Sequence, residues 1–184
     1  MGKRNIKLIV ILLSIITICI ITAGCGKGDD AYRGEQSQLA VERVFDKIKT
    51  AYGEDYLPDT EIDSEHLKEE FKLDKELIEE QKGELPAIGF RPDRLLVVKA
   101  KEGKGEEVEK QLNEARQEKI NDSMMYPVNA AKIKAAKVVR RGDYVAFILL
   151  GATDENVDAP ERQQAEFAAA QTQRGVDAFE EAFR

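Results

Sequence analysis

A short apolar run near the N-terminus limits what this chain can fold into, because it takes the first 24 residues out of the folded domain. Residues 8–21 are almost entirely apolar, and residues 1–7 carry three positive charges and no acid. Fourteen helical residues rise about 21 Å, which is less than the roughly 30 Å hydrocarbon core of a membrane. The pattern therefore predicts a signal peptide over residues 1–24 rather than a membrane span.

Cys25 indicates which kind of signal peptide this is. The sequence Thr22-Ala23-Gly24-Cys25 resembles the lipobox of bacterial lipoproteins, although Thr22 stands where leucine is usual. After cleavage Cys25 would be the only cysteine, so an internal disulfide is excluded, and lipidation accounts for the odd thiol. The alternative is an ordinary signal peptide followed by an incidental cysteine. We expect a diacylglyceryl lipid on Cys25, which would anchor the protein on the extracytoplasmic face of the cell membrane.

The charge of the chain narrows the range of its partners. The formal net charge is −7, and removal of the positively charged segment 1–24 would make it more negative. A domain this acidic is repelled by nucleic acid and by anionic lipid headgroups. We therefore expect no nucleic-acid partner. The expected partners are the membrane, through the lipid on Cys25, and a protein or another ligand of the cell envelope.

The chain after Cys25 reads as a tether followed by one domain. Residues 25–36 are polar and rich in glycine, which predicts a flexible, lipid-anchored tether. Residues 37–184 are enough for a single domain with its own core. Their pattern predicts an α+β fold, with a mainly antiparallel sheet of about four strands, helices packed on one side, and N-terminal helices before the sheet.

The hydrophobic spacing also gives approximate bounds for the elements of this domain. The expected helices are 37–52, a short one from 63 or 64, a second short one from 74 to Gly83, one running to about 121, and one that is capped by Asp158 and runs to the C-terminus. The expected strands are 95–101, 138–140 and 144–150, and residues 85–90 are expected to form an edge strand or an extended segment. Residues 130–136 fit either a helical turn or the start of a strand.

The mature chain is poorly supplied with catalytic side chains. Its one histidine, His66, lies in a short polar helix, where we interpret it as a solvated surface residue. Ser37, Ser64 and Ser123 lack the sequence context of a nucleophile elbow, and acylation of Cys25 would exclude cysteine catalysis. Zinc and other transition metals need several His or Cys ligands. The sequence therefore predicts no enzyme, no catalytic residue, no cofactor and no metal.

The abundant carboxylates leave two alternatives open. Asp55, Asp59, Glu61 and Asp63 alternate through an irregular segment, and carboxylate oxygens are the ligands that Ca²⁺ prefers. The EF-hand spacing is absent, so a solvated acidic loop is the other interpretation of this segment. Paired carboxylates could also hydrolyse polymers of the cell envelope. Acids are so frequent in this chain that their pairing in the sequence decides nothing.

One apolar loop is a candidate binding surface. It consists of Met124, Met125, Tyr126, Pro127 and Val128. Large apolar residues in a connection often line a binding site, although the loop could equally pack back onto the end of the sheet. A basic stretch follows directly, and its members are Lys132, Lys134, Lys137, Arg140 and Arg141. We interpret this stretch as a positive strip whose alternate residues face solvent.

Several segments together resemble a known family. They are the lipobox, AYGEDYLP at 51–58, VKAKEG at 98–103, YPVN at 126–129 and KVVRRGDY at 137–144. In these segments the chain resembles a family of small lipoproteins from Gram-positive bacteria that is known only as a domain of unknown function (domain-of-unknown-function family 4358). The resemblance runs from about Val41 to Phe183 and supplies no activity, ligand or catalytic residue. It implies a membrane-anchored lipoprotein, and we expect a non-enzymatic binding or interaction module.

Overall fold

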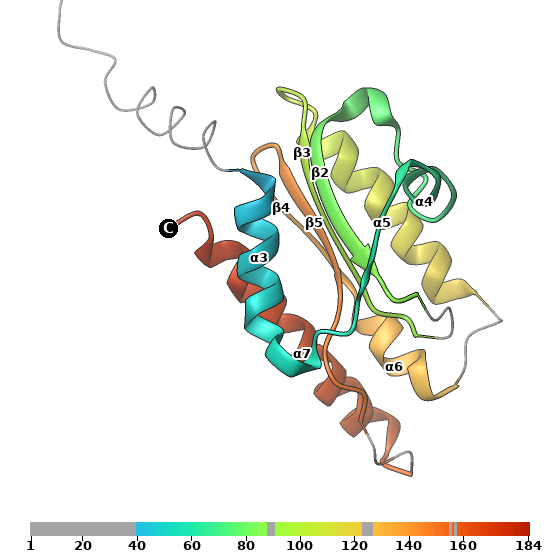
Figure 1. The fold of residues 1–184 in the computed structure, drawn as a ribbon. Coiled ribbons are helices and arrows are strands. Elements are labelled where there is room, and N and C mark those ends of the chain that lie inside the picture. Colours follow the sequence, from blue (N-terminus) through green and yellow to red (C-terminus); the bar gives the residue numbers. More distant parts are fainter. Residues whose placement is uncertain (1–39, 88–90, 123–126, 155, 157) are drawn as a thin grey trace, which may run out of the picture. The chain divides into compact units, whose positions relative to one another are not determined.

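The structure is a computed structural model, and it describes residues 40–184 except for 88–90, 123–126, 155 and 157 (Figure 1). The predicted signal peptide, Cys25 and the predicted tether lie outside the described residues. Within the described ranges, no helix is both long enough and apolar enough to cross a membrane.

The described residues form an antiparallel sheet in the order β1-β2-β3-β5-β4. The strands are β1 (Thr60–Glu61), β2 (Ile78–Leu85), β3 (Arg94–Ala100), β4 (Lys137–Arg141) and β5 (Tyr144–Leu149). The predicted α+β class and the antiparallel sheet are confirmed, with five strands where the sequence predicts about four. The strands predicted at 95–101, 138–140 and 144–150 correspond to β3, β4 and β5. Strand β2 lies where a helix is predicted, and the two-residue β1 is too short to give a hydrophobic pattern of its own.

Helices cover both faces of the sheet, and not the one face that the sequence predicts (Figure 1). They are α3 (Val41–Tyr52), α4 (Ser64–Glu69), α5 (Gly105–Asn121), α6 (Pro127–Ala135) and α7 (Glu161–Glu181), with 3₁₀ turns at Gly53–Asp55 and Lys75–Leu77. Helices α3 and α7 pack on one face. Helices α4 and α5 pack on the other face, and α6 lies beside α7.

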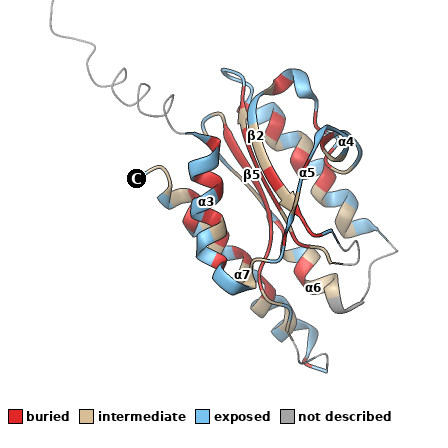
Figure 2. Ribbon diagram, in the orientation of Figure 1, coloured by how far each residue is buried: buried red, intermediate tan, exposed pale blue. Residues whose placement is uncertain are grey.

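The central strands explain why two layers of helices are needed. In β3, Leu95 and Val97 point into the core beneath α3 and α7, whereas Leu96 and Val98 point into the core beneath α5. Every residue of β5 is buried as well, as the red ribbon in Figure 2 shows. A strand that is apolar on both sides must be covered on both sides.

The predicted helix from residue 74 to Gly83 is wrong, because the chain makes one 3₁₀ turn there and then enters β2. Helix-forming residues dominate this segment, but pairing of β2 with β1 and β3 overrides their propensity. The side of β2 that faces α3 carries charged residues, and these residues form ion pairs with the helix. Lys82 forms an ion pair with Glu42 (2.7 Å), and Glu84 forms one with Lys49 (2.8 Å). Strand β2 ends at Leu85, and Pro86 and Ala87 belong to no strand. Residues 88–90, the rest of the edge strand or extended segment predicted at 85–90, lie outside the described residues.

Candidate ligand-binding groove

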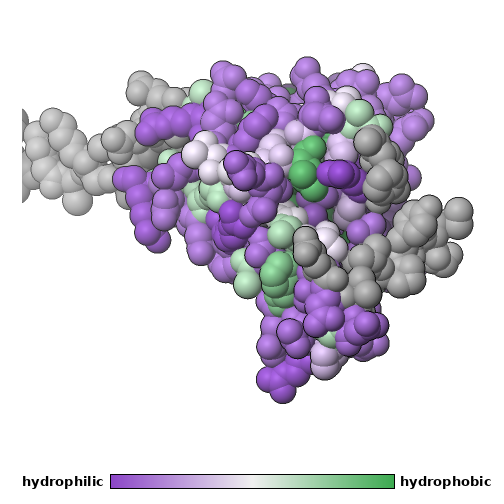
Figure 3. Space-filling view, turned by 60° about the horizontal axis from the view of Figure 1, so that its bottom comes forward, coloured by the Kyte–Doolittle hydropathy of each residue, from purple (hydrophilic) through white to green (hydrophobic). Residues whose placement is uncertain are grey.

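A groove of about 1030 Å³ lies between α6 and the first half of α7. Its walls are largely alanine: Ala130, Ala131 and Ala135 come from α6, and Ala165, Ala168 and Ala169 come from α7. Small side chains leave room between the two helices at this place. We call this feature the α6–α7 groove. Figure 3, which turns the bottom of Figure 1 forward, shows pale and green side chains among the purple ones on this side of the molecule.

A buried ion pair fixes the α6 wall of the groove. Lys132 of α6 is 3 % exposed and Asp93, just before β3, is 1 % exposed. The Lys132 ammonium donates to Asp93 Oδ1 (2.6 Å) and to the Gly151 carbonyl (2.5 Å). Burial raises the pKa of the Asp93 carboxyl, and the Lys132 ammonium opposes that rise. Two charges taken out of water need such partners, because each unpaired ion would cost several kcal/mol.

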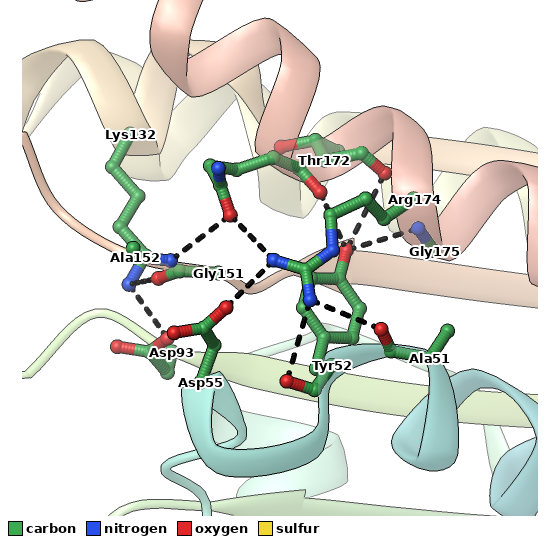
Figure 4. A network of polar contacts seen from close by, with 11 residues as sticks. Ala51, Tyr52, Asp55, Asp93, Lys132, Gly151, Ala152, Thr172, Arg174 and Gly175 are labelled. Carbon is green, nitrogen blue, oxygen red and sulfur yellow. Dashed lines mark hydrogen bonds and ion pairs between the residues drawn. The ribbon is translucent and has the colours of Figure 1, made fainter.

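A polar network continues from this pair to α7, just beyond the part of the helix that lines the groove (Figure 4). The turn after β5 places Gly151 at φ 107°, and the next N–H, that of Ala152, donates to Gln171 Oε1 (3.3 Å). The Arg174 guanidinium also donates to Gln171 Oε1 (2.8 Å) and to Asp55 Oδ2 (2.7 Å). The network thus joins α7 to the turn beneath α6.

Arg174 also binds to the C-terminal end of α3. It donates to the carbonyl oxygen of Ala51 (3.1 Å), and its guanidinium lies over the ring of Tyr52, 5.0 Å from the ring centroid. The last carbonyl groups of a helix have no partner within the helix, so a cation there satisfies one of them and interacts favourably with the helix dipole. One side chain of α7 therefore holds the C-terminal end of α3 in place.

Tyr52 penetrates the backbone of α7. Its hydroxyl donates to the Gln171 carbonyl (3.0 Å) and accepts from the Gly175 N–H (3.1 Å), the two groups that an α-helix would normally join. Burial raises the pKa of Tyr52 to about 12, so the hydroxyl keeps the proton that it donates. A side chain at position 175 has no room, because a Cβ there would lie 2.6 Å from the Tyr52 Oη.

Residues 51–150 match the family model described as Domain of unknown function (DUF4358). The chain belongs to this family. The match begins at the C-terminal end of α3, contains all five strands with α4, α5 and α6, and stops before α7. No curated protein and no solved structure matches the chain. The family carries no assigned function, so the chemistry of this DUF4358 member has to be read from its own residues.

The groove has charged side chains that a ligand could reach, but Lys132 and Asp93 are not among them. Asp93 is too deeply buried to meet a substrate, and Lys132 already has two acceptors. The other charged residues of the groove lining are Lys134, Lys137, Asp154 and Glu161. Among the described residues, no group of three or more His, Cys, Asp or Glu side chains could hold a metal ion. The arrangement suits recognition of a ligand better than proton transfer.

The predicted apolar surface lies mostly beyond what the structure describes. Met124, Met125 and Tyr126 lie outside the described residues. Pro127 and Val128 form the first turn of α6, and their side chains are likewise outside the description. The segment thus leads directly into one wall of the groove, and its role as a binding surface stays a prediction.

The basic stretch is not the single strip that the sequence predicts. Lys132 is buried, Arg140 pairs with Glu109 (2.7 Å), and Arg141 pairs with Glu180 (3.1 Å). Residues 132 and 134 belong to a helix and not to a strand, which is why one of them turns inward. Sequence reasoning missed Lys132 and Asp93 as partners, because 39 positions separate them.

The acidic segment 55–63 is spread over separate structural contacts. Asp55 pairs with Arg174 (2.7 Å), and Asp59 Oδ1 accepts from the Ala87 N–H (2.8 Å). Asp63 caps α4 by accepting from the backbone N–H groups of Glu65 and His66. The His66 ring also lies against Asp63 Oδ1 (2.8 Å). These carboxylates therefore point to different partners instead of converging on one cation.

Proposed function

We propose that this protein is a lipid-anchored, extracytoplasmic binding module whose α6–α7 groove takes up a ligand without transforming it. The observation that carries the proposal is the groove itself, about 1030 Å³ in volume, whose α6 wall is fixed by the buried pair of Lys132 and Asp93. Ligand sites are typically concavities of roughly 300–1,000 Å³ with mostly apolar walls and a few polar groups. The α6–α7 groove has this size and this composition.

The anchoring part of the proposal rests on the N-terminal sequence. A charged start, a short apolar run and Thr22-Ala23-Gly24-Cys25 follow one another in the order of a lipoprotein signal. Two acyl chains make anchoring stable, because each buried methylene contributes about 0.8 kcal/mol. The folded domain then needs no membrane-binding surface, which agrees with its acidic character.

The non-enzymatic part rests on the chemistry of the groove. A carboxylate-based hydrolase needs an acid that can reach its substrate, whereas Asp93 is shielded and bound to Lys132. The groove-lining Asp154 accepts from the Asn156 N–H (3.0 Å), which makes it part of its own turn. Glu161 lies in the first turn of α7, where the helix dipole favours an acid. We therefore propose binding and do not propose hydrolysis.

Site-specific photocrosslinking in intact cells tests this function. A photoreactive amino acid replaces Ala165, which is exposed and lines the groove, in the full-length chain. The matched control carries the same group at Arg43, which is exposed on α3 and does not line the groove. We expect a discrete adduct from position 165 that position 43 does not give. No adduct at 165, or the same adducts from both positions, would contradict the proposal.

A further inference from the structure

We infer that the ligand of the α6–α7 groove is an acidic peptide segment, held through its carboxylates by Lys134 and Lys137. This inference rests on the proposed function, since it assigns a chemistry to the occupant of the same groove. It is carried by the charge on one rim of the groove and by the shape and composition of the walls.

Two lysines on the same rim provide the charge. Lys134 lies in the last turn of α6 and Lys137 opens β4, and both are exposed and line the groove. In the part of the chain that the structure describes, neither ammonium group forms an ion pair. Their neighbours Lys132, Arg140 and Arg141 all have acidic partners. These two cations are therefore available to carboxylates of a ligand.

The number of free cations favours a peptide over a polyanion. A polymer with a negative charge on every unit binds best to a long row of basic residues. The protein as a whole repels such a polymer, because its net charge is −7. That repulsion is screened beyond about 8 Å at physiological ionic strength, so contacts within the groove decide what stays bound. Two lysines match a segment with one or two acidic side chains.

The walls suit the uncharged part of such a peptide. Alanines on both sides leave space for side chains of the ligand, and the half-buried ring of Phe167 offers an apolar contact in the same lining. Asp154 and Glu161 lie in the lining contributed by the turn after β5 and the start of α7. Their charge disfavours carboxylates there, which directs the acidic part of the peptide toward Lys134 and Lys137.

Retention of peptide pools by the purified full-length protein tests the inference. The probes are randomised octapeptides synthesised with two fixed glutamates and a matched pool with two fixed glutamines. We expect stronger retention of the glutamate pool, and about tenfold weaker retention of that pool by Lys134→Gln/Lys137→Gln, since each of the two exposed charge pairs contributes about threefold. The control variant Lys68→Gln/Lys75→Gln removes two exposed lysines outside the groove lining and is expected to bind like the wild type.

The outcomes separate this inference from the proposed function. Equal retention of both pools, or a glutamate preference that survives in Lys134→Gln/Lys137→Gln, would overturn the acidic-peptide assignment. If the Ala165 photocrosslinker still gives its adduct in that case, the groove binds a ligand of another chemistry. If no pool is retained and no adduct forms at position 165, both proposals fail.

Discussion

At the scale of single residues, the groove depends on two charges that the fold has removed from water. Lys132 and Asp93 are both almost fully buried, and they come from α6 and from the entrance to β3. Such a pair contributes little net stability, because desolvation offsets most of the attraction. Its role is geometric, since the Lys132 ammonium also holds the Gly151 carbonyl and so positions the turn below α6.

Removing only the cation should therefore be costly. We expect Lys132→Met to lower the free energy of unfolding by about 3–5 kcal/mol, because Asp93 would be left buried without a counter-charge. Urea denaturation measures this change. Lys134→Met on the exposed side of the same helix is the control and should change stability by less than about 0.5 kcal/mol.

The coupling between the two residues is tested by a double-mutant cycle. In an Asp93→Asn background, Lys132→Met should cost clearly less than it does alone, because no buried charge is then orphaned. Strictly additive losses would show that the two side chains do not act as a pair.

Gly175 is the other residue on which the site depends. In an ordinary helix interior, Gly→Ala stabilises by about 1 kcal/mol. Here the new Cβ would lie 2.6 Å from Tyr52 Oη and 2.8 Å from Ile148 Cγ2, so we expect Gly175→Ala to destabilise by about 1–2 kcal/mol. Thermal and urea unfolding report the change. The loss should shrink in a Tyr52→Phe background, which removes the closest atom, and a stabilising Gly175→Ala would contradict the close contact.

At the scale of elements, the strength of a sequence pattern decides what could be predicted. Strand β3 and helices α3, α5 and α7 have strong periodicity or β-branched runs, and the sequence predicts them close to their observed bounds. The unbroken apolar run at 95–98 also contains the signal for a sheet covered on both faces, because a half-exposed strand would alternate. Strand β2 could not be predicted, since its polar residues find their partners on α3 only in three dimensions.

The groove was beyond prediction for a similar reason. Asp93 lies in an Arg-Pro-Asp segment that is typical of a turn, and Lys132 lies in a basic stretch that is typical of a surface. Their burial follows from α6 closing over the end of the sheet, which no local pattern reports. The sequence shows the lysines near the groove, but it does not show which of them form ion pairs with acidic residues.

Glu70 links three elements and gives a pH-dependent prediction. It accepts from Arg94 at the start of β3 and from Lys119 on α5 (2.6 Å), and it follows the end of α4. Burial acts to raise the pKa of Glu70, but Arg94 and Lys119 outweigh burial and hold that pKa below its ordinary value of 4.5. A lowered folded-state pKa stabilises the fold above the unfolded-state pKa, and this stabilisation is lost as the pH falls through the folded-state value.

We therefore expect Glu70→Gln to lower the free energy of unfolding by about 2 kcal/mol at pH 7. The difference from the wild type should shrink as the pH falls below about 4.5. Urea denaturation at a series of pH values measures both effects. Glu69→Gln, at the exposed neighbouring position, is the control and should show no such trend. A difference that is the same at pH 3.5 and pH 7 would contradict the ionic link between α4, β3 and α5.

At the scale of the whole molecule, the proposed lipid anchor and the groove would contribute separately to the proposed function. The anchor would fix where the protein works, and the groove would fix what it binds. We expect metabolic labelling with an alkyne-bearing fatty acid to mark the wild type and to be lost in Cys25→Ser. Cys19→Ser is the control and should keep the label, because Cys19 lies within the predicted signal peptide. Label that persists in Cys25→Ser would place the lipid on another residue, and an unlabelled wild type would contradict the lipid anchor.

The family match divides the groove between two parts of the chain. Its α6 wall lies within residues 51–150, whereas its α7 wall lies beyond them. Arg174 of α7 joins the two parts, because it donates to Asp55 Oδ2 within the matched region. Ligand binding in this member should therefore depend on α7 as much as on the matched region.

Blocking the groove from its α7 wall is the most direct test of the account. The full-length chain would carry a photoreactive amino acid at Ala131 on the α6 wall, combined with either Ala165→Trp or Ala170→Trp. Both alanines are exposed on α7, but only Ala165 lines the groove. We predict that Ala165→Trp abolishes the adduct formed in cells at position 131 and that Ala170→Trp leaves it intact. An adduct of equal yield in both variants would show that the ligand does not bind between α6 and α7.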